Sequence, residues 1–142
     1  MSSKFYAESA YLSQLAFSGK AVPNDYNPLV QKERTNRMHL GVVVRQYSKL
    51  MENKVDPRLV IKVIIIARDR MKNYVDNGGS MTKTVDVVTD PKGDKTSITV
   101  NALQKRVNKL VSNHAEEVAA FDEAEEIRIA KVYEASKQHK GY

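Results

Sequence analysis

Three histidines and a run of carboxylates are the side chains of this sequence that could do chemistry. His39, His114 and His139 lie far apart along the chain, and none stands in the His-Glu-x-x-His spacing that binds zinc. The sequence holds no glycine-rich phosphate loop and no serine in a nucleophile motif. It also contains no cysteine, which excludes disulfides and thiolate chemistry. We therefore expect no catalytic residues and no cofactor, and we predict that the protein is not an enzyme.

The carboxylates form an acidic block within residues 116–126, composed of Glu116, Glu117, Asp122, Glu123, Glu125 and Glu126. Di-iron helix bundles repeat a Glu-x-x-His motif on facing helices, whereas here His114 precedes Glu117 and no second copy exists. We predict no metal site. Few basic residues stand three or four positions from these carboxylates, so the acidic block is not neutralised on its own helix. Two interpretations stay open: a hydrated surface, or contact with a basic stripe of the same chain or of a neighbouring subunit.

A basic stripe is predicted on a helix over about residues 28–53. At 100° per residue, four cations share one arc beside the apolar face of this helix: Arg34, Arg37, Arg45 and Lys49. Together with the lysines of a predicted β-hairpin, they make a candidate phosphate-binding surface for DNA or RNA. The hairpin lysines are Lys83, Lys92 and Lys95. No aromatic platform stands near them, so binding would follow the nucleic-acid backbone and read little sequence. The alternative is a set of solvated cations beside a core face.

The hairpin is predicted over about residues 81–100. Both arms alternate in polarity and are rich in Thr and Val, and the segment 90–94, Asp-Pro-Lys-Gly-Asp, supplies turn residues between them. Its apolar side chains are predicted to share one face: Val85, Val87, Ile98 and Val100. Because a two-stranded hairpin is at best marginally stable alone, this face must be covered by a helix or by a neighbouring subunit.

The remaining patterns predict a mainly α fold, a helical bundle of about four helices with one β-hairpin inserted before a long C-terminal helix. Helices are expected over about residues 4–18, 28–53, 57–77 and 101–138, in a single domain that spans 1–142. Asn27-Pro28 and Asp56-Pro57 place a capping residue before a proline at two of the helix starts. The apolar residues at 60, 61 and 63–66 surround much of this helix, so the third helix is either central in the fold or part of a subunit interface.

The last predicted helix is longer than a compact domain of this size. A helix of about 38 residues extends about 57 Å at about 1.5 Å per residue. It must therefore bend, break near Ser112-Asn113, or project towards a neighbour. Its drifting apolar seam includes Phe121, Ile129 and Val132, which we predict to be subunit contacts together with the apolar hairpin face.

The chain of 142 residues has a net charge of +6 that is unevenly spread. Residues 1–110 hold a net charge of +9, and residues 111–142 a net charge of −3. The first residues lack the apolar core of a signal peptide, and the longest apolar run, 63–67, is too short to span a bilayer. We expect a soluble protein without membrane contact. We predict that the protein is located in the cytoplasm, or in a virion if it is viral, and that it is not secreted by a signal peptide.

The order of these elements resembles, in outline, small helical proteins that form rings in viral DNA packaging or in portal–tail connectors, which also combine helices with a hairpin. The resemblance implies a ring-forming assembly protein. We accordingly predict a non-enzymatic, homo-oligomeric structural protein whose hairpin and long C-terminal helix make the subunit contacts. Other assembly proteins are further candidate partners. The alternative is a nucleic-acid-binding module that uses the basic stripe and the hairpin lysines, and the two functions are compatible.

Overall fold

The computed structural model describes residues 27–139. The helix predicted over 4–18 lies outside these residues. Contacts within the chain divide it into two units, Met1–Arg34 and Thr35–Tyr142. The elements described below belong to the second unit, apart from the first turns of helix α2. The single domain predicted for 1–142 stays a prediction.

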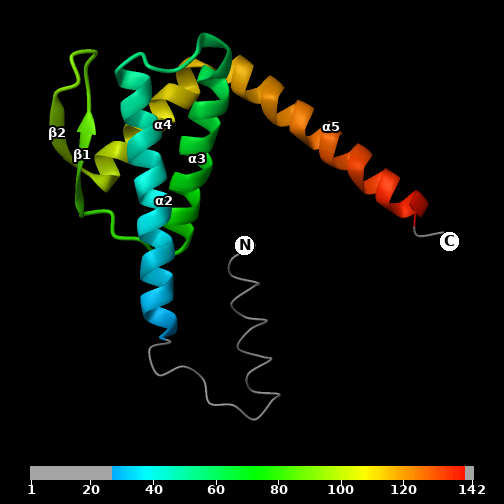
Figure 1. The fold of residues 1–142 in the computed structure, drawn as a ribbon, viewed down its shortest axis with the longest axis horizontal. Helices are drawn as coiled ribbons and strands as arrows, with labels where there is room; N and C mark the ends of the chain where they lie inside the picture. Colours follow the sequence, from blue (N-terminus) through cyan, green and yellow to red (C-terminus); the bar gives the residue numbers. More distant parts are fainter. Residues whose placement is uncertain (1–26, 140–142) are drawn as a thin grey trace. The chain divides into compact units, whose positions relative to one another are not determined.

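The described part of the chain is mainly helical and carries one two-stranded antiparallel sheet (Figure 1). In chain order its elements are α2 (Pro28–Met51), the 3-10 turn η1 (Pro57–Leu59), α3 (Val60–Asp76), β1 (Thr84–Val88), β2 (Lys95–Thr99), α4 (Val100–Asn113) and α5 (Ala115–His139). The hairpin lies between α3 and α4. The predicted fold class, helical with a hairpin inserted before the C-terminal helices, is therefore confirmed.

Short polar side chains cap the starts of these helices. The Asn27 side chain accepts a hydrogen bond from the Leu29 N–H at 2.9 Å. Asp56 accepts from the Arg58 N–H at 2.9 Å in front of η1, and the Thr99 hydroxyl accepts from the N–H of residue 102 at 3.1 Å in front of α4. Each cap satisfies an N–H that has no partner within the helix, which is why helices begin at these positions.

Two helices end in the same way, with a residue at positive φ. After α2, Asn53 adopts a φ of 56°, and the N–H of the next residue donates to the Lys49 carbonyl at 3.0 Å. After α3, Gly78 adopts a φ of 74°, and the Gly79 N–H donates to the Tyr74 carbonyl at 2.9 Å. Both ends are Schellman motifs, which need a residue that tolerates the left-handed conformation. Asparagine and glycine are the residues that do so most readily.

The hairpin turn uses the residues that the sequence offers for it. The Asp90 carboxylate accepts a hydrogen bond from the Lys92 N–H at 2.9 Å, and the Gly93 N–H donates to the Asp90 carbonyl at 3.2 Å. Gly93 adopts a φ of 86°, in the left-handed region that favours glycine. The carboxylate of Asp90 is therefore used for the turn itself.

The strand register places the apolar hairpin side chains on one face. Val85 pairs with Ile98, and Val87 pairs with Thr96. Val87 is fully buried, and Val85 and Ile98 are half-buried against the core of the same chain. Val100, predicted on the same face, is the first residue of α4 and is also fully buried. Within the described chain, helices thus cover this face, which was one of the two expected solutions.

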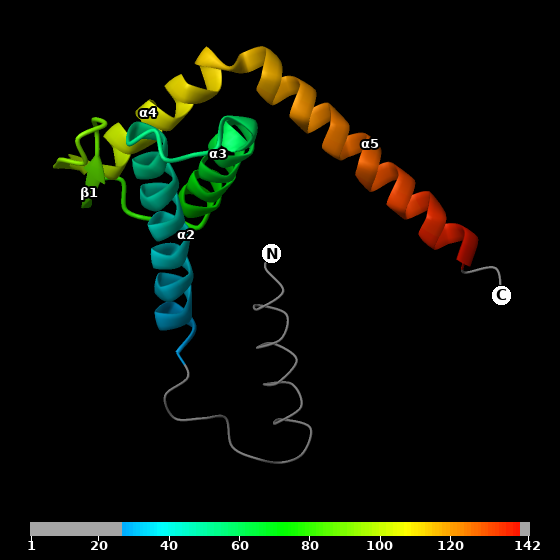
Figure 2. The same cartoon turned by 45° about the horizontal axis from the view of Figure 1, so that its top comes forward.

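Helix α3 is the central helix of the described part. It contributes to a larger core shared with α2, the hairpin and α4, and to a smaller core shared with α4 and α5. The buried members of the larger core are Leu40, Val43, Tyr47, Ala67, Met71, Tyr74, Val87, Val100, Leu103 and Val107. Those of the smaller core are Ile64, Ile65 and Val118. Two views show α4 running across α2 and α3 (Figure 1, Figure 2).

The helix predicted over 101–138 is divided at His114 into α4 and α5, and a break close to this position was one of the three outcomes expected for so long a helix. His114 adopts φ −123° and ψ 34°, and its N–H donates to the Val111 carbonyl, three residues earlier, at 3.2 Å. Its Nδ1 lies 3.0 Å from the Leu110 carbonyl. A carbonyl only accepts, so Nδ1 carries the proton and caps α4 from the side chain. The His114 carbonyl then accepts from the Val118 N–H at 2.9 Å and starts α5.

Candidate interaction surfaces

The start of α5 is docked onto α3. Val118 is buried against Ile64 and Ile65, and Phe121 is half-buried beside them. These contacts belong to one face of α5, which we call the proximal α5 face: Val118, Phe121, Asp122 and Glu125. Its members are separated by one, three or four residues and therefore lie on one side of the helix.

An ion pair completes this docking. The two terminal nitrogens of Arg68 donate to the two carboxylate oxygens of Asp122 at 2.7 and 3.0 Å. Hydrogen bonds from Arg68 hold the pKa of the Asp122 carboxyl below its ordinary value. The same bonds raise the pKa of Arg68. A bidentate pair fixes the rotation of α5 as well as its distance from α3.

The acidic block therefore has partners, but none of those observed is the basic stripe. Asp122 pairs with Arg68, and Glu125 pairs with Arg128 on the same helix at 3.0 Å. The Glu125 pair has the spacing of three residues that makes helix side chains neighbours. Within residues 27–139, no ion pair joins the acidic block to α2. Contact between the block and the stripe of a neighbouring subunit stays a prediction.

The apolar pattern of α5 continues beyond the docked turns. Adding eleven residues, or three helical turns, to each position of the proximal α5 face leads to Ile129, Val132, Tyr133 and Ser136, which we call the distal α5 face. Ile129 and Val132 are each 58% exposed and Tyr133 is 59% exposed. Ile129 and Val132 were predicted as contact residues. Tyr133 and Ser136 were missed, although the eleven-residue repeat signals them.

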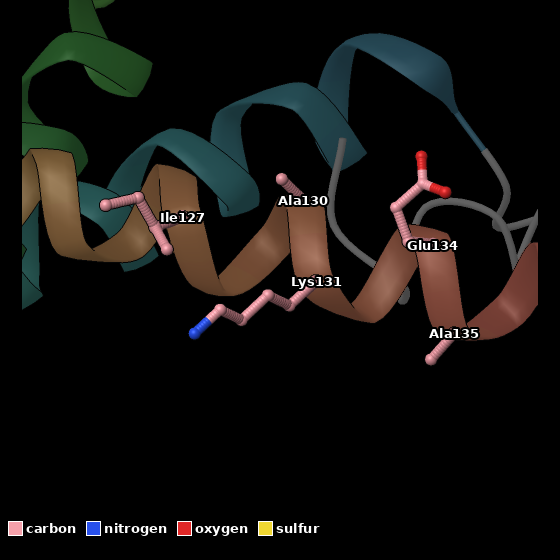
Figure 3. A pocket seen from close by; sticks show the side chains of 5 residues that line it. All are labelled: Ile127, Ala130, Lys131, Glu134 and Ala135. Atoms are coloured by element: carbon pink, nitrogen blue, oxygen red, sulfur yellow. The ribbon is translucent and has the colours of Figure 1, made fainter.

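The opposite side of the same stretch borders a shallow hollow of about 420 Å³. Among the described residues, its lining comes from α5 alone: Ile127, Ala130, Lys131, Glu134 and Ala135 (Figure 3). Ile127 is 50% exposed. One helix face cannot enclose a small molecule, so these residues make no built ligand site.

A second hollow of about 340 Å³ lies where the α2–α3 corner meets the break between α4 and α5. Its lining is mostly apolar: Leu50, Met51, Asn53, Val55, Pro57, Val60, Ile64, Leu110 and His114. The Nδ1 of His114 is already used by the Leu110 carbonyl. In the described range 27–139, His, Asp and Glu side chains form no group of three that could hold a metal ion.

The cations of the predicted basic stripe that lie in the second unit are exposed. Arg37, Arg45 and Lys49 are spaced eight and four residues apart along α2, and no carboxylate of residues 27–139 pairs with them. Arg34 is also exposed but belongs to the first unit. Gly41 stands four residues from Arg37 and from Arg45, and a Cβ added there would have no atom within 4 Å. Between Arg37 and Arg45, another molecule could therefore approach the backbone of α2 closely.

Further cations lie on α4, and sequence reasoning missed them. This helix carries Lys105, Arg106 and Lys109 and no acidic residue. All three are exposed, and Arg106 also donates a hydrogen bond to the Tyr47 hydroxyl of α2 at 3.1 Å. The hairpin lysines Lys83, Lys92 and Lys95 are likewise exposed. The absence of acidic residues from α4 was the available signal.

His39 of α2 is the buried polar residue of the described core, with 5% of its surface exposed. Its Nδ1 lies 3.3 Å from Nη1 of Arg70 on α3. A guanidinium only donates, so Nδ1 accepts and the proton of the neutral ring sits on Nε2. Burial, and then the charge of Arg70, lower the pKa of His39. The contact is structural, since it ties α2 to α3.

Comparison with models of known protein families, with curated protein sequences and with solved structures found no match to this chain. Among the helices of residues 27–139, none is long and apolar enough to cross a membrane.

Proposed function

We propose that the protein is a non-enzymatic, homo-oligomeric structural protein that works in an assembly, of the viral packaging or portal–tail connector type. The observation that supports this most directly is the distal α5 face. It repeats, three turns later, the face that α3 covers, but its large side chains are more than half exposed among the described residues. Burying one such side chain contributes about 1.5–3 kcal/mol.

The length of α5 supports the same proposal. Only its first turns pack on α3, and every described side chain from residue 126 to 137 is exposed. Helices of fewer than about 12–15 residues are marginal in water without packing. A neighbour that covers the distal α5 face would stabilise this half of the helix.

The hairpin offers a second contact surface for the same assembly. Its sheet has two strands, and Lys95, Thr96 and Ser97 of β2 are exposed. The outer edge of a strand presents unpaired N–H and C=O groups that a strand of another chain can meet. Val87 and Val100 are fully buried in their own chain, so the hairpin contributes through this edge and through the half-buried Ile98.

The solution mass of the double variant I129D/V132D tests the proposal. The unmodified chain is expected to be an oligomer by light scattering, and this variant is expected to dissociate because a buried unpaired carboxylate is costly. The matched control is I127D/A130D, which adds the same two carboxylates, also three residues apart, on the opposite side of α5. A monomeric unmodified chain, or equal effects of both changes, would contradict the proposal.

Nucleic-acid binding is a second candidate, favoured by the cations of α2. Arg37, Arg45 and Lys49 are exposed without carboxylate partners among the described residues, and Gly41 leaves the backbone open between them. Phosphates could therefore approach this face closely. Binding of this kind depends on the release of counterions and weakens steeply with salt.

Retention of the protein on immobilised DNA and RNA tests this second candidate function. The variant R37E/R45E is expected to lose retention at low salt, whereas K62E/K72E, which makes the same charge change on α3, is expected to keep it. Both control positions are exposed. Unchanged retention of R37E/R45E would exclude the α2 cations as the binding surface.

A further inference from the structure

The charges of α5 are sorted along the helix. The first half, residues 115–126, contains the six carboxylates of the acidic block and neither lysine nor arginine. The second half, residues 127–139, contains Arg128, Lys131 and Lys137 against a single carboxylate, Glu134. The helix therefore has an acidic half beside α3 and a basic half that carries the distal α5 face.

Part of this charge is used within the chain. Asp122 is held by Arg68, Glu125 by Arg128, and Lys137 lies 4.7 Å from the centre of the Tyr133 ring. Glu126 is exposed, and no ion pair of the described residues includes it. Its position is eleven residues before that of Lys137, so the two lie on one edge of the distal α5 face.

We propose that the distal α5 face binds the same face of a second copy in antiparallel orientation, about a two-fold axis. This inference rests on the proposed homo-oligomeric function and names the partner and geometry of one contact. A two-fold interface needs a self-complementary surface. The distal α5 face has such a surface. Its apolar centre can pack against the same centre of a second copy, and one edge carries Glu126 at one end and Lys137 at the other.

The register follows from the apolar centre. Ile129 of one copy packs against Val132 of the second, and the axis passes between them. About an axis perpendicular to the helices, the same edge of each helix meets across the interface. Glu126 of one copy then lies within about one helical turn of Lys137 of the second, since the two positions differ by about 3 Å along the axis at about 1.5 Å per residue. The symmetric pair forms at the other end.

A parallel pair fits the charges less well. It would set the acidic first halves of two helices side by side, and like charges in proximity weaken association. The antiparallel pair instead brings the basic half of each helix towards the acidic half of the other. The basic residues of one copy are thus placed near carboxylates of the acidic block of the other copy that have no ion-pair partner among the described residues.

Disulfide trapping tests the orientation directly, because the chain contains no cysteine. The full-length variants E126C and K137C, made distinguishable by mass, are mixed under mild oxidation. The antiparallel pair predicts a mixed disulfide between positions 126 and 137, identified by mass spectrometry. A parallel pair sets positions 126 and 137 about 16 Å apart along the helix axis and predicts no mixed disulfide, so the absence of this product would overturn the inference. The control E116C, at an exposed position in the first turn of α5, is expected to give no disulfide with K137C.

A charge swap provides a second readout that does not depend on thiols. Either E126K or K137E is expected to raise the dimer dissociation constant about tenfold, and E126K/K137E to restore it within about threefold. An oligomer that shows neither the mixed disulfide nor this rescue would overturn the antiparallel contact but leave the homo-oligomeric function standing. A chain that stays monomeric would overturn both.

Discussion

At the scale of single residues, His39 links the packing of α2 and α3 to pH. It is buried, it accepts a hydrogen bond from Arg70, and its folded-state pKa is lowered from 6.5. Below pH 6.5 the unfolded chain therefore binds a proton at His39 that the folded chain takes up only at a lower pH. The free energy of unfolding must therefore decrease as the pH is lowered through that interval, because stability rises with increasing pH wherever the unfolded state binds more protons.

We expect the free energy of unfolding to decrease as the pH is lowered from 7 to 5. In the variant H39Q we expect this decrease to be smaller. Glutamine has no group that titrates in this range, so the difference between the two slopes belongs to His39. Urea unfolding at several pH values measures both slopes. Equal slopes would show that His39 is protonated to the same extent in the folded and unfolded chains.

The pair between Arg68 and Asp122 adds to the apolar contacts that dock α5 on α3. We expect R68M and D122N each to lower the free energy of unfolding by about 1 kcal/mol, because the pair is bidentate but partly exposed to solvent. The exposed pair between Glu125 and Arg128 on α5 itself serves as the control, and R128M is expected to lower the free energy of unfolding less than R68M does.

The same pair has a signature at acid pH. The pKa of Asp122 is lowered from 3.8, so its contribution is present above that value and is lost as the pH falls further. D122N is therefore expected to be less sensitive to acid than the unmodified chain. A variant with the same acid sensitivity would contradict the assigned role of the pair.

At the scale of elements, local chemistry could be predicted from the sequence and long-range contacts could not. Asn27 and Asp56 begin helices as expected, because a cap depends only on residues one or two positions away. The break at His114 was one of three solutions considered, one residue beyond the expected place. It depends on how an imidazole reaches a carbonyl. Arg68 and Asp122, 54 residues apart, come together only through the folded core.

Two glycines give a paired prediction about the helices. Gly41 lies inside α2, is exposed and has open space around its would-be Cβ, so G41A is expected to stabilise the protein by about 0.8–1 kcal/mol. At Gly79 a Cβ would overlap the Tyr74 ring, so G79A is expected to destabilise it by more than about 1 kcal/mol. Thermal unfolding of both variants measures whether each substitution raises or lowers the stability. A destabilising G41A would show that this position already has a close neighbour.

At the scale of the whole molecule, the question is what covers the exposed second half of α5. The patterns that predicted contact residues on the last helix identified Ile129 and Val132, and the structure exposes both. Phe121, predicted together with them, is instead half-buried on α3. Sequence patterns alone could not separate these cases, because an apolar position shows that a side chain is to be covered but not by which chain.

We propose above that the distal α5 face joins copies of this chain. Sedimentation velocity over a range of concentrations tests it most directly, with the unmodified full-length chain and I129D/V132D measured side by side. We expect an oligomer for the unmodified chain and a shift towards monomer for the variant, with a helical circular-dichroism spectrum showing that the variant is folded. An unmodified chain that sediments as a monomer at every concentration would contradict the proposed role of the distal α5 face.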